Sequence, residues 1–275
     1  MKWPADLRPL NSFSPAALDP SVRLALLAAH PDDETIGATR LLAQLSLPLV
    51  IFLTDGAPRH TRFWSPQAPG SREEYAALRR EEAERALAHA GIGSQQIVFL
   101  GGVDQEVIFE IGRLTACLVE TLQAQETEAV LTHAYEGGHP DHDAAALMAN
   151  LAVSRLPQAA RPELFEMTSY HARDGRCVSG EFLPAQQVDE ICLELSAQEQ
   201  QRKRRMMDEY GSQRLVLENF PIRSERIRRA PTYDFSRPPH PGKLWYECMG
   251  WPLAGARWRE LAVQALSESE EQACR

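Results

Sequence analysis

The stretch LALLAAHPDDE, residues 24–34, joins a short apolar run to a cluster of side chains that can bind metal. The apolar part, Leu24 to Ala29, has the length and unbroken hydrophobicity of a strand buried on both faces. It leads into His30-Pro31-Asp32-Asp33-Glu34, and proline suits a first helical turn because its missing N–H is not needed there. The stretch therefore predicts a strand-to-helix junction that carries imidazole and carboxylate groups.

The same alternation of apolar runs and helical patterns continues to about residue 155. The best-marked helix has a capping box of Ser71 and Glu74 at its start and Gly91 beyond its end. Continuously apolar strands that alternate with helices predict an α/β fold, Rossmann-like, in which helices cover both faces of a mostly parallel sheet. Further strands are expected at 49–54, 97–100 and 129–132, and helices at 35–45, 71–91, 110–123 and after residue 142.

The second half of the chain is less regular. A strand near residues 164–170 and a polar helix at 196–210 precede a Pro- and Arg-rich stretch, APTYDFSRPPHPGK, and a tail rich in tryptophan. No linker marks a second domain, so residues 1–275 are expected to form a single domain. Its core is expected at about 22–213, and a C-terminal extension of loops and edge elements, about 214–275, is expected to wall the site.

Composition and motifs argue against several classes of protein. A net charge of −9 is unlike that of general nucleic-acid binders, and no apolar run approaches the roughly 20 residues that span a bilayer. The N-terminal stretch has no apolar secretory core, and the five cysteines are odd in number and scattered, which indicates reduced thiols in a cytoplasmic protein. No G-x-G-x-x-G follows the first strand, as a nicotinamide enzyme would require.

A second phrase, His139-Pro140-Asp141-His142, follows the strand expected at 129–132. In parallel sheets ligand sites lie beyond the carboxyl ends of the strands, so both phrases are expected at one site. His30 and Asp33 stand at i and i+3 and can converge, and His142 would complete the three protein ligands of a catalytic zinc ion.

Other side chains of the two phrases remain for proton transfer. Asp32 can take a proton from a zinc-activated water, and His139, oriented by Asp141, can stabilise an oxyanion and assist the leaving amine. Each phrase alone is equally consistent with an Asp that caps a helix and a His in a polar loop. Because both follow predicted strands, the pair indicates a metal hydrolase.

At these residues the chain resembles the LmbE/PIG-L family of metal-dependent N-deacetylases. The family phrases AHPDDE and HPDH stand here at 29–34 and 139–142. The segment Arg79-x-x-Glu82-Ala83, the FLGGVD stretch with Asp104, and Lys203 with Tyr210-x-Ser212-Gln213 extend the resemblance over most of residues 22–213.

The resemblance implies a Rossmann-like fold, a catalytic zinc, with iron as the alternative metal, and hydrolysis of an N-acyl amide, usually the N-acetyl group of a glucosamine unit. The partner would then be a small N-acyl sugar or a glycoconjugate. Carried over by position, the metal ligands are His30, Asp33 and His142, the general base is Asp32, and the oxyanion or acid partner is His139 with Asp141. Arg79 and Asp104 would bind sugar hydroxyls.

Several alternatives stay open. Arg79 also fits an ordinary ion-paired helix, and Asp104 a turn. The basic runs at 201–205 and 223–229 fit solvated helix faces or a site for an anionic substrate, and the tail tryptophans fit packing anchors or sugar platforms. A zinc amidase for non-sugar amides is the second candidate function. A non-catalytic metal-binding domain is the third, against which Asp32 and His139 argue. The oligomeric state is open, a homo-oligomer included.

Overall fold

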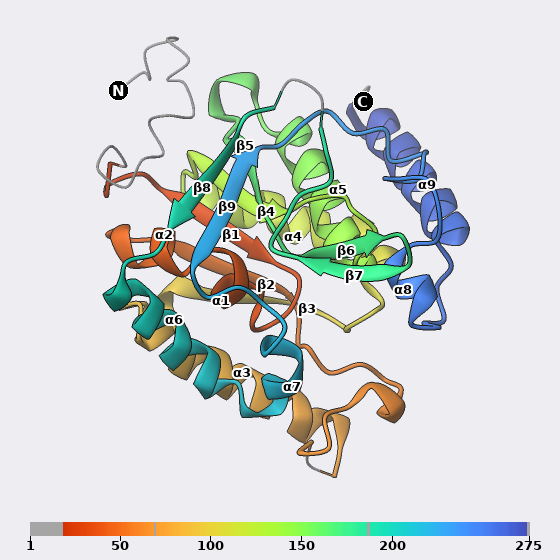
Figure 1. Ribbon diagram of the computed structural model, residues 1–275. Helices are drawn as coiled ribbons and strands as arrows, with labels where there is room; N and C mark the ends of the chain where they lie inside the picture. Colours follow the sequence, from red (N-terminus) through yellow and green to blue (C-terminus); the bar gives the residue numbers. More distant parts are fainter. Residues whose placement is uncertain (1–18, 69, 186–187, 274–275) are drawn as a thin grey trace.

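The computed structural model describes residues 19–68, 70–185 and 188–273 (Figure 1). The N-terminal stretch, in which no apolar secretory core was found, lies mostly outside these ranges, and so does Cys274. The strands are β1 Leu24–Ala28, β2 Leu49–Thr54, β3 Ile97–Gly102, β4 Ala129–His133, β5 Glu163–Met167, β6 Tyr170–Arg173, β7 Arg176–Ser179, β8 Glu190–Glu194 and β9 Ser224–Arg229. The α-helices are α1 Asp33–Gly37, α2 Thr39–Gln44, α3 Arg72–Ala88, α4 Ile111–Ala124, α5 Pro140–Arg155, α6 Ala197–Glu209, α7 Arg214–Leu217, α8 Trp245–Cys248 and α9 Gly255–Ala273.

The main sheet has the strand order β3-β2-β1-β4-β5-β9-β8. The first five strands pair in parallel, whereas β9 is antiparallel to both β5 and β8. Strands β6 and β7 form a separate antiparallel hairpin. The predicted α/β fold with a mostly parallel sheet is therefore confirmed.

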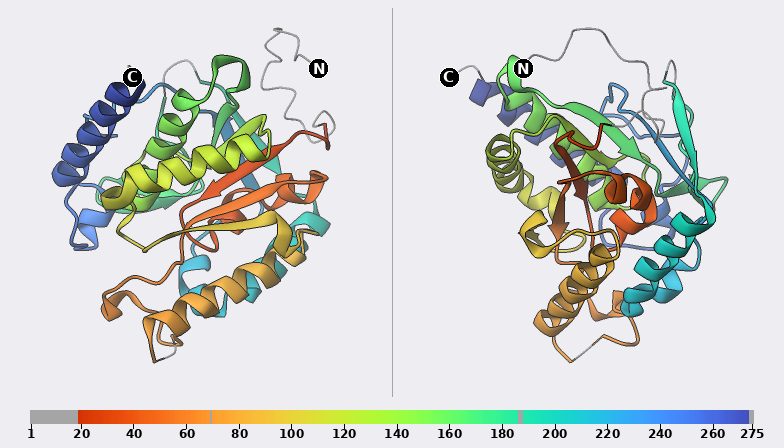
Figure 2. Two further views of the ribbon diagram at one scale, coloured as in Figure 1. Left: turned by 180° about the vertical axis from the view of Figure 1, so that it is seen from behind. Right: turned by 90° about the vertical axis from the view of Figure 1, so that its left-hand side faces the viewer.

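Helices cover both faces of this sheet (Figure 2). Strand β1 shows the alternation, because Ala25 and Leu27 join one apolar core while Leu24 and Leu26 join the other. The first core includes residues of α4, α5 and α9, and the second includes residues of α2, α3 and α6. Burial on both faces explains why β1, β2 and β4 are apolar without alternation.

The predicted boundaries hold best where a local signal marks them. Helix α3 begins after Ser71, whose hydroxyl accepts a hydrogen bond from the N–H of Glu74 at 3.2 Å. The Glu74 carboxylate accepts in return from the N–H of Ser71 at 2.9 Å, which completes the capping box. Gly91, beyond the helix end, has φ +81°, a conformation that glycine adopts without strain.

The helix expected at 35–45 is wrong as one element. It is split into α1 and α2, because Ala38 leaves the helical conformation with φ −144°. The basic run at 223–229 is also not a solvated helix face. Its residues from Ser224 form β9, a strand between β5 and β8 of the main sheet.

The structure also bears on the expectations about membrane-spanning segments and cysteines. No helix in the described part of the chain is long and apolar enough to cross a membrane. Within that same part, Cys117, Cys177, Cys192 and Cys248 are free thiols.

Candidate metal and catalytic site

The two His-Pro-Asp phrases meet at the centre of the sheet. The first follows β1 and the second follows β4, and these two strands are neighbours. From β1 the chain continues to β2 on one side, whereas β4 lies on the other side. This is the switch point of an open parallel sheet, where connections diverge and a ligand site forms beyond the carboxyl ends of the strands.

The carboxylate of Asp33 is surrounded by three imidazoles. Its Oδ2 lies 3.3 Å from His30 Nδ1 and 3.3 Å from His133 Nε2, and its Oδ1 lies 3.2 Å from His142 Nε2. The backbone N–H of His30 also donates to Oδ2 at 2.8 Å. The predicted ligands His30, Asp33 and His142 are thus brought together, with ligand atoms within 4.8 Å of one another.

The electrostatics of this group suit a divalent cation. Burial lowers the pKa of His142 to about 3, so its imidazole keeps a free lone pair. Burial opposes ionisation of Asp33, but His142 and His133 hold its pKa well below the ordinary value. Metal ligands must be neutral imidazoles or ionised carboxylates, and two nitrogens with one oxygen are a donor set that zinc accepts. The residues present therefore fit a catalytic zinc ion.

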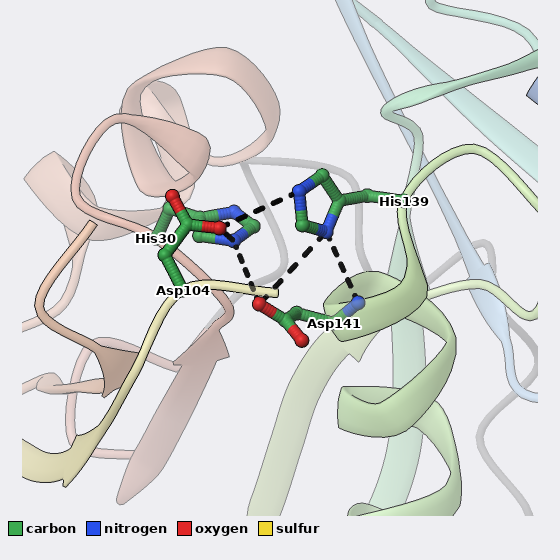
Figure 3. A group of neighbouring side chains, drawn as sticks. All are labelled: His30, Asp104, His139 and Asp141. Atoms are coloured by element: carbon green, nitrogen blue, oxygen red, sulfur yellow. Dashed lines mark hydrogen bonds and ion pairs between the residues drawn. The ribbon is translucent and has the colours of Figure 1, made fainter. Parts of the chain in front are cut away.

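A second set of side chains gathers on the other edge of the His30 ring (Figure 3). His30 Nε2 lies 3.2 Å from Asp104 Oδ1 and 3.2 Å from Asp141 Oδ2, and His139 Nε2 lies 3.6 Å from Asp104 Oδ1. Burial opposes a charge on His30, but Asp104 and Asp141 raise its pKa well above the ordinary value. These carboxylates therefore favour a positive charge here, and they put Asp104 inside the site.

Asp32 lies beside the ligand group in an unusual backbone conformation. Its φ of +124° is one that residues with a side chain rarely adopt, and such outliers gather at functional sites. The carboxylate is buried, and its Oδ2 accepts from Arg79 Nη2 at 3.1 Å. Burial raises the pKa of Asp32 to about 7, although the Arg79 charge opposes this shift.

His139 caps helix α5 and is held by backbone. Its Nδ1 accepts a hydrogen bond from the N–H of Asp141 at 3.0 Å, which leaves the imidazole proton on Nε2. The Asp141 carboxylate, which was expected to orient His139, lies 4.0 Å from Nδ1. Instead it accepts from the backbone N–H groups of Gln105 at 2.6 Å and Val107 at 3.2 Å, because the loop after β3 offers those donors. Asp141 thus orients His139 through its backbone and holds that loop with its side chain.

Arg79 does not lie where a sugar hydroxyl could reach it freely. The residue is only 2% exposed, and its guanidinium donates to the carbonyl oxygen of Pro31 and to Asp32. Its Nη1 lies 3.5 Å from the hydroxyl of Ser212. These contacts favour a role for Arg79 in positioning Asp32, and direct contact with a sugar stays a prediction.

Two residues near the site, His133 and Tyr170, were not singled out from the sequence, and a third, Trp251, is one of the tail tryptophans for which packing and sugar binding both stayed open. His133, at the end of β4, contacts Asp33, and its ring stacks on that of His142 with 3.9 Å between centroids. Its place at the carboxyl end of a buried strand was the available signal. Tyr170 and Trp251 flank the imidazoles, with ring centroids 5.3 Å from His142 and 4.4 Å from His139 respectively. No local pattern places these two side chains beside the imidazoles, because they come from segments far along the chain.

Comparison with known proteins relates the chain to deacetylases. Residues 25–153 match the PIG-L family, described as GlcNAc-PI de-N-acetylase. A Bacillus cereus protein described as probable N-acetyl-alpha-D-glucosaminyl L-malate deacetylase 2 is 28% identical over 138 residues, which are 48% of this chain. The matched segment spans 61% of that relative's length.

Solved structures show the same fold. The A40926 pseudoaglycone deacetylase has a TM-score of 0.58 at 18% identity, covering 78% of this chain and 98% of its own. The 4-carboxy-2-hydroxymuconate hydratase of Pseudomonas putida has a TM-score of 0.53 at 15% identity, with the same coverage of both chains. One fold thus carries two classes of reaction, so the reaction has to be argued from the side chains in the site.

Proposed function

We propose, since residues 25–153 match the PIG-L family, that this protein is a metal-dependent N-deacetylase. Its substrate would be an N-acetylglucosamine unit in a small molecule or glycoconjugate. One observation carries the proposal: a buried carboxylate with a pKa of about 7, that of Asp32, lies next to the three-ligand group of His30, Asp33 and His142. A merely structural metal site has no use for such a group.

The ligand group would hold one divalent cation, and its two imidazoles and one carboxylate favour zinc. When bound, the cation polarises the amide carbonyl and lowers the pKa of a coordinated water. The chain's own contribution is to keep both imidazoles and the carboxylate in place. His133 supports this because its Nε2 contacts the same Asp33 oxygen, Oδ2, as His30 Nδ1 does.

Asp32 would supply both proton transfers. As a carboxylate it accepts a proton from the attacking water while the water oxygen bonds to the acetyl carbon. As a carboxylic acid it then gives this proton to the amide nitrogen when the C–N bond breaks, which releases acetate and a free amine. A pKa of about 7 suits both the uptake and the release of a proton near neutral pH, because neither the carboxylate nor the carboxylic acid form of Asp32 is strongly disfavoured.

His139 would stabilise the oxyanion and not act as the acid. Its Nδ1 is occupied by the N–H of Asp141, so a second ring proton would face that N–H. Burial and the imidazoles of His30 and His142 also lower the pKa of His139 well below the ordinary value. The neutral ring keeps its proton on Nε2, where it can donate to the oxygen of the tetrahedral intermediate.

The proposal is tested by acetate release from the zinc-loaded protein. The substrates are N-acetylglucosamine, a nucleotide-linked N-acetylglucosamine, an N-acetylglucosamine O-glycoside and the non-sugar amide N-acetylethanolamine. We expect turnover of at least one sugar, and a loss of about 10²–10⁴-fold in the Asp32→Asn variant from missing proton transfer. Zinc content should be unchanged in that variant, because Asp32 is not a ligand.

Glu84→Gln removes an exposed carboxylate of α3 that is not part of the ligand group, and it serves as the control. Full activity in Asp32→Asn would contradict the mechanism. A zinc-loaded protein that releases acetate from none of the sugars would contradict the proposed substrate class.

A further inference from the structure

Trp251 brings an indole ring to the site from outside the family-matched segment. It lies between α8 and α9, more than a hundred residues after His139. Its ring meets the imidazole of His139 edge-on, with 4.4 Å between centroids and 65° between planes. The residue is partly exposed, so it retains surface for a further contact.

The indole is held in place from two sides. The backbone N–H of Trp251 donates to the carbonyl oxygen of Tyr246 at 3.1 Å, which continues the turn after α8. Arg62 Nη2 donates to the carbonyl oxygen of Gly250 at 3.0 Å, and the ring of Phe63 lies 6.0 Å from that of Trp251 at 82°. A short segment after β2 and the C-terminal segment thus meet beside His139.

The indole N–H distinguishes Trp251 from two other tryptophans. Trp64 Nε1 donates to the carbonyl oxygen of Pro58 at 2.7 Å, and Trp258 Nε1 donates to that of Pro140 at 3.0 Å. Both rings are therefore fixed packing elements. Trp251 Nε1 donates to no acceptor in the described part of the chain, so a polar donor remains available beside the site.

The size of the substrate decides which part of it can meet this ring. An acetyl group ends at its methyl carbon, one bond from the reacting carbonyl. Within the described part of the chain, the ring of Trp251 contacts the imidazole of His139 but has no ring contact with His30 or His142. A substrate group that reaches Trp251 from the ligand group therefore has to extend past His139, and the larger, amine side has that length whereas the acetyl group does not. A pyranose suits an indole because its C–H face is apolar and its hydroxyls can accept from Nε1–H.

We propose that Trp251 is a specificity-determining residue that binds the sugar ring of the leaving amine. This rests on the deacetylase function proposed above. The indole face would pack against the C–H face of the glucosamine ring, and Nε1–H would donate to a ring hydroxyl. The C-terminal segment would thereby select sugars, while the two His-Pro-Asp phrases perform the reaction.

The competing role for Trp251 is to orient His139, and kinetics separate the two. In Trp251→Ala we expect KM for N-acetylglucosamine to rise about tenfold, with kcat within about twofold, because ground-state and transition-state binding are lost equally. KM and kcat for N-acetylethanolamine, which has no ring, should not change. Trp251→Phe keeps an aromatic face and should recover part of the affinity. An equal fall in kcat for both substrates would instead assign Trp251 to the positioning of His139 and overturn the proposal.

Product binding gives a readout that does not depend on turnover. Calorimetric titration of the zinc-loaded protein with glucosamine should show binding that weakens at least fivefold in Trp251→Ala. Met249→Ala, two residues away with a half-exposed side chain, should leave it unchanged. Binding that is absent in the unaltered protein, or equal in Trp251→Ala, overturns the Trp251 proposal. Absence of acetate release with intact, Trp251-dependent glucosamine binding would overturn only the reaction.

Discussion

Hydrogen bonds hold Asp32 in an unfavourable backbone conformation. A residue with φ of +124° and ψ of −27° costs about 1–3 kcal/mol, so the surroundings have to hold it there. The N–H of Asp32 donates to Glu34 Oε2 at 2.9 Å, and its carbonyl oxygen accepts from the N–H groups of Thr35 and Ile36, each at 3.0 Å. The five-residue phrase therefore contains its own brace, in which Glu34 holds the residue two positions before it.

Arg79 tunes the charge of Asp32, which makes the pH profile a test of its role. The Arg79 guanidinium lowers the pKa of Asp32, whereas burial raises it. Because the base acts as a carboxylate, activity rises as pH rises through this pKa. In Arg79→Gln the opposing charge is gone, so the rising limb of kcat/KM should move to higher pH. Arg79→Lys should move it less, and zinc affinity should stay unchanged in both.

The comparison needs folded variants, which circular dichroism establishes before the kinetics. A rising limb that stays at the same pH in folded Arg79→Gln would contradict the positioning role. If KM for the sugar rises in Arg79→Gln while the rising limb of kcat/KM stays at the same pH, the result would support direct contact between Arg79 and the sugar.

At the residue scale, the sequence predicts which side chains come together at the site better than it predicts which hydrogen bonds each of them makes. His30 and Asp33 converge because i and i+3 spacing on a first helical turn is a local property. The Asp141 carboxylate instead contacts the loop at Gln105, because that loop offers two free N–H groups. Which donors a side chain meets depends on how β3 and α5 pack, and the spacing of residues within one phrase carries no information about this.

At the element scale, helix α6 and the turn after it support the first phrase from the far half of the chain. The hydroxyl of Tyr210 donates to Glu34 Oε1 at 2.6 Å, and Lys203 Nζ donates to the carbonyl oxygen of Ile36 at 2.7 Å. Ser212 donates its N–H and its hydroxyl to Glu82, at 2.8 and 2.6 Å. Among the residues that extended the family resemblance, Tyr210 thus contacts the phrase that carries Asp32, and Lys203 contacts the helix α1 that continues it. Ser212 contacts Glu82 on α3, the helix that also carries Arg79.

Tyr210→Phe tests this support because it removes one hydroxyl and keeps the ring. Glu34 is fully buried, so losing a donor to it should lower the free energy of unfolding by about 1–3 kcal/mol. The brace on Asp32 should loosen, and kcat should fall while zinc affinity is retained. Urea unfolding and acetate release measure the two effects. An unchanged kcat in a destabilised variant would limit Tyr210 to a structural role.

Lys203 and Glu225 form a fully buried ion pair between α6 and β9, with 2.9 Å between Nζ and Oε1. Lys203→Met should lower the free energy of unfolding by about 3–5 kcal/mol, because Glu225 then keeps a buried, unpaired charge. Adding Glu225→Gln should restore part of this. Arg204→Met, which removes an exposed charge from the same helix, should change stability by about 0.5 kcal/mol or less. If urea unfolding gave the same loss of stability for Lys203→Met and Arg204→Met, this would contradict the stabilising role of the buried Lys203–Glu225 pair.

Strand β9 shows why the second half was harder to predict at this scale. The letters SERIRR are those of a solvated basic run, yet Glu225 and Arg228 are each only 2% exposed. Arg228 is buried because Glu166, on the neighbouring β5, accepts from its Nε at 2.7 Å. A cross-strand partner more than sixty residues away does not appear in a local pattern, whereas the apolar runs of β1, β2 and β4 need no particular partner.

At the scale of the whole molecule, the two halves of the chain contribute different parts of the site. The half up to α5 supplies the parallel strands β1 to β4, the ligand group and Asp32, and it follows from local patterns. The later half supplies β8 and β9, the support from α6 and the tryptophan segment, and it contacts the first half through partners far apart in sequence (Figure 1). The fold class and the meeting of the two His-Pro-Asp phrases were therefore predictable, while the side chains that surround and support the site were not.

The hydrogen bond between Tyr210 and Glu34 spans 176 positions of the chain, and that between Lys203 and Ile36 spans 167. During synthesis, the first strands and the HPDDE phrase leave the ribosome long before these partners exist. Contacts over such distances form slowly, so the parallel strands β1 to β4 can pair before the strained turn at Asp32 is secured. A nascent chain that stops before α6 would then be able to collapse without becoming an enzyme, and catalytic competence would arise as one of the last events of folding.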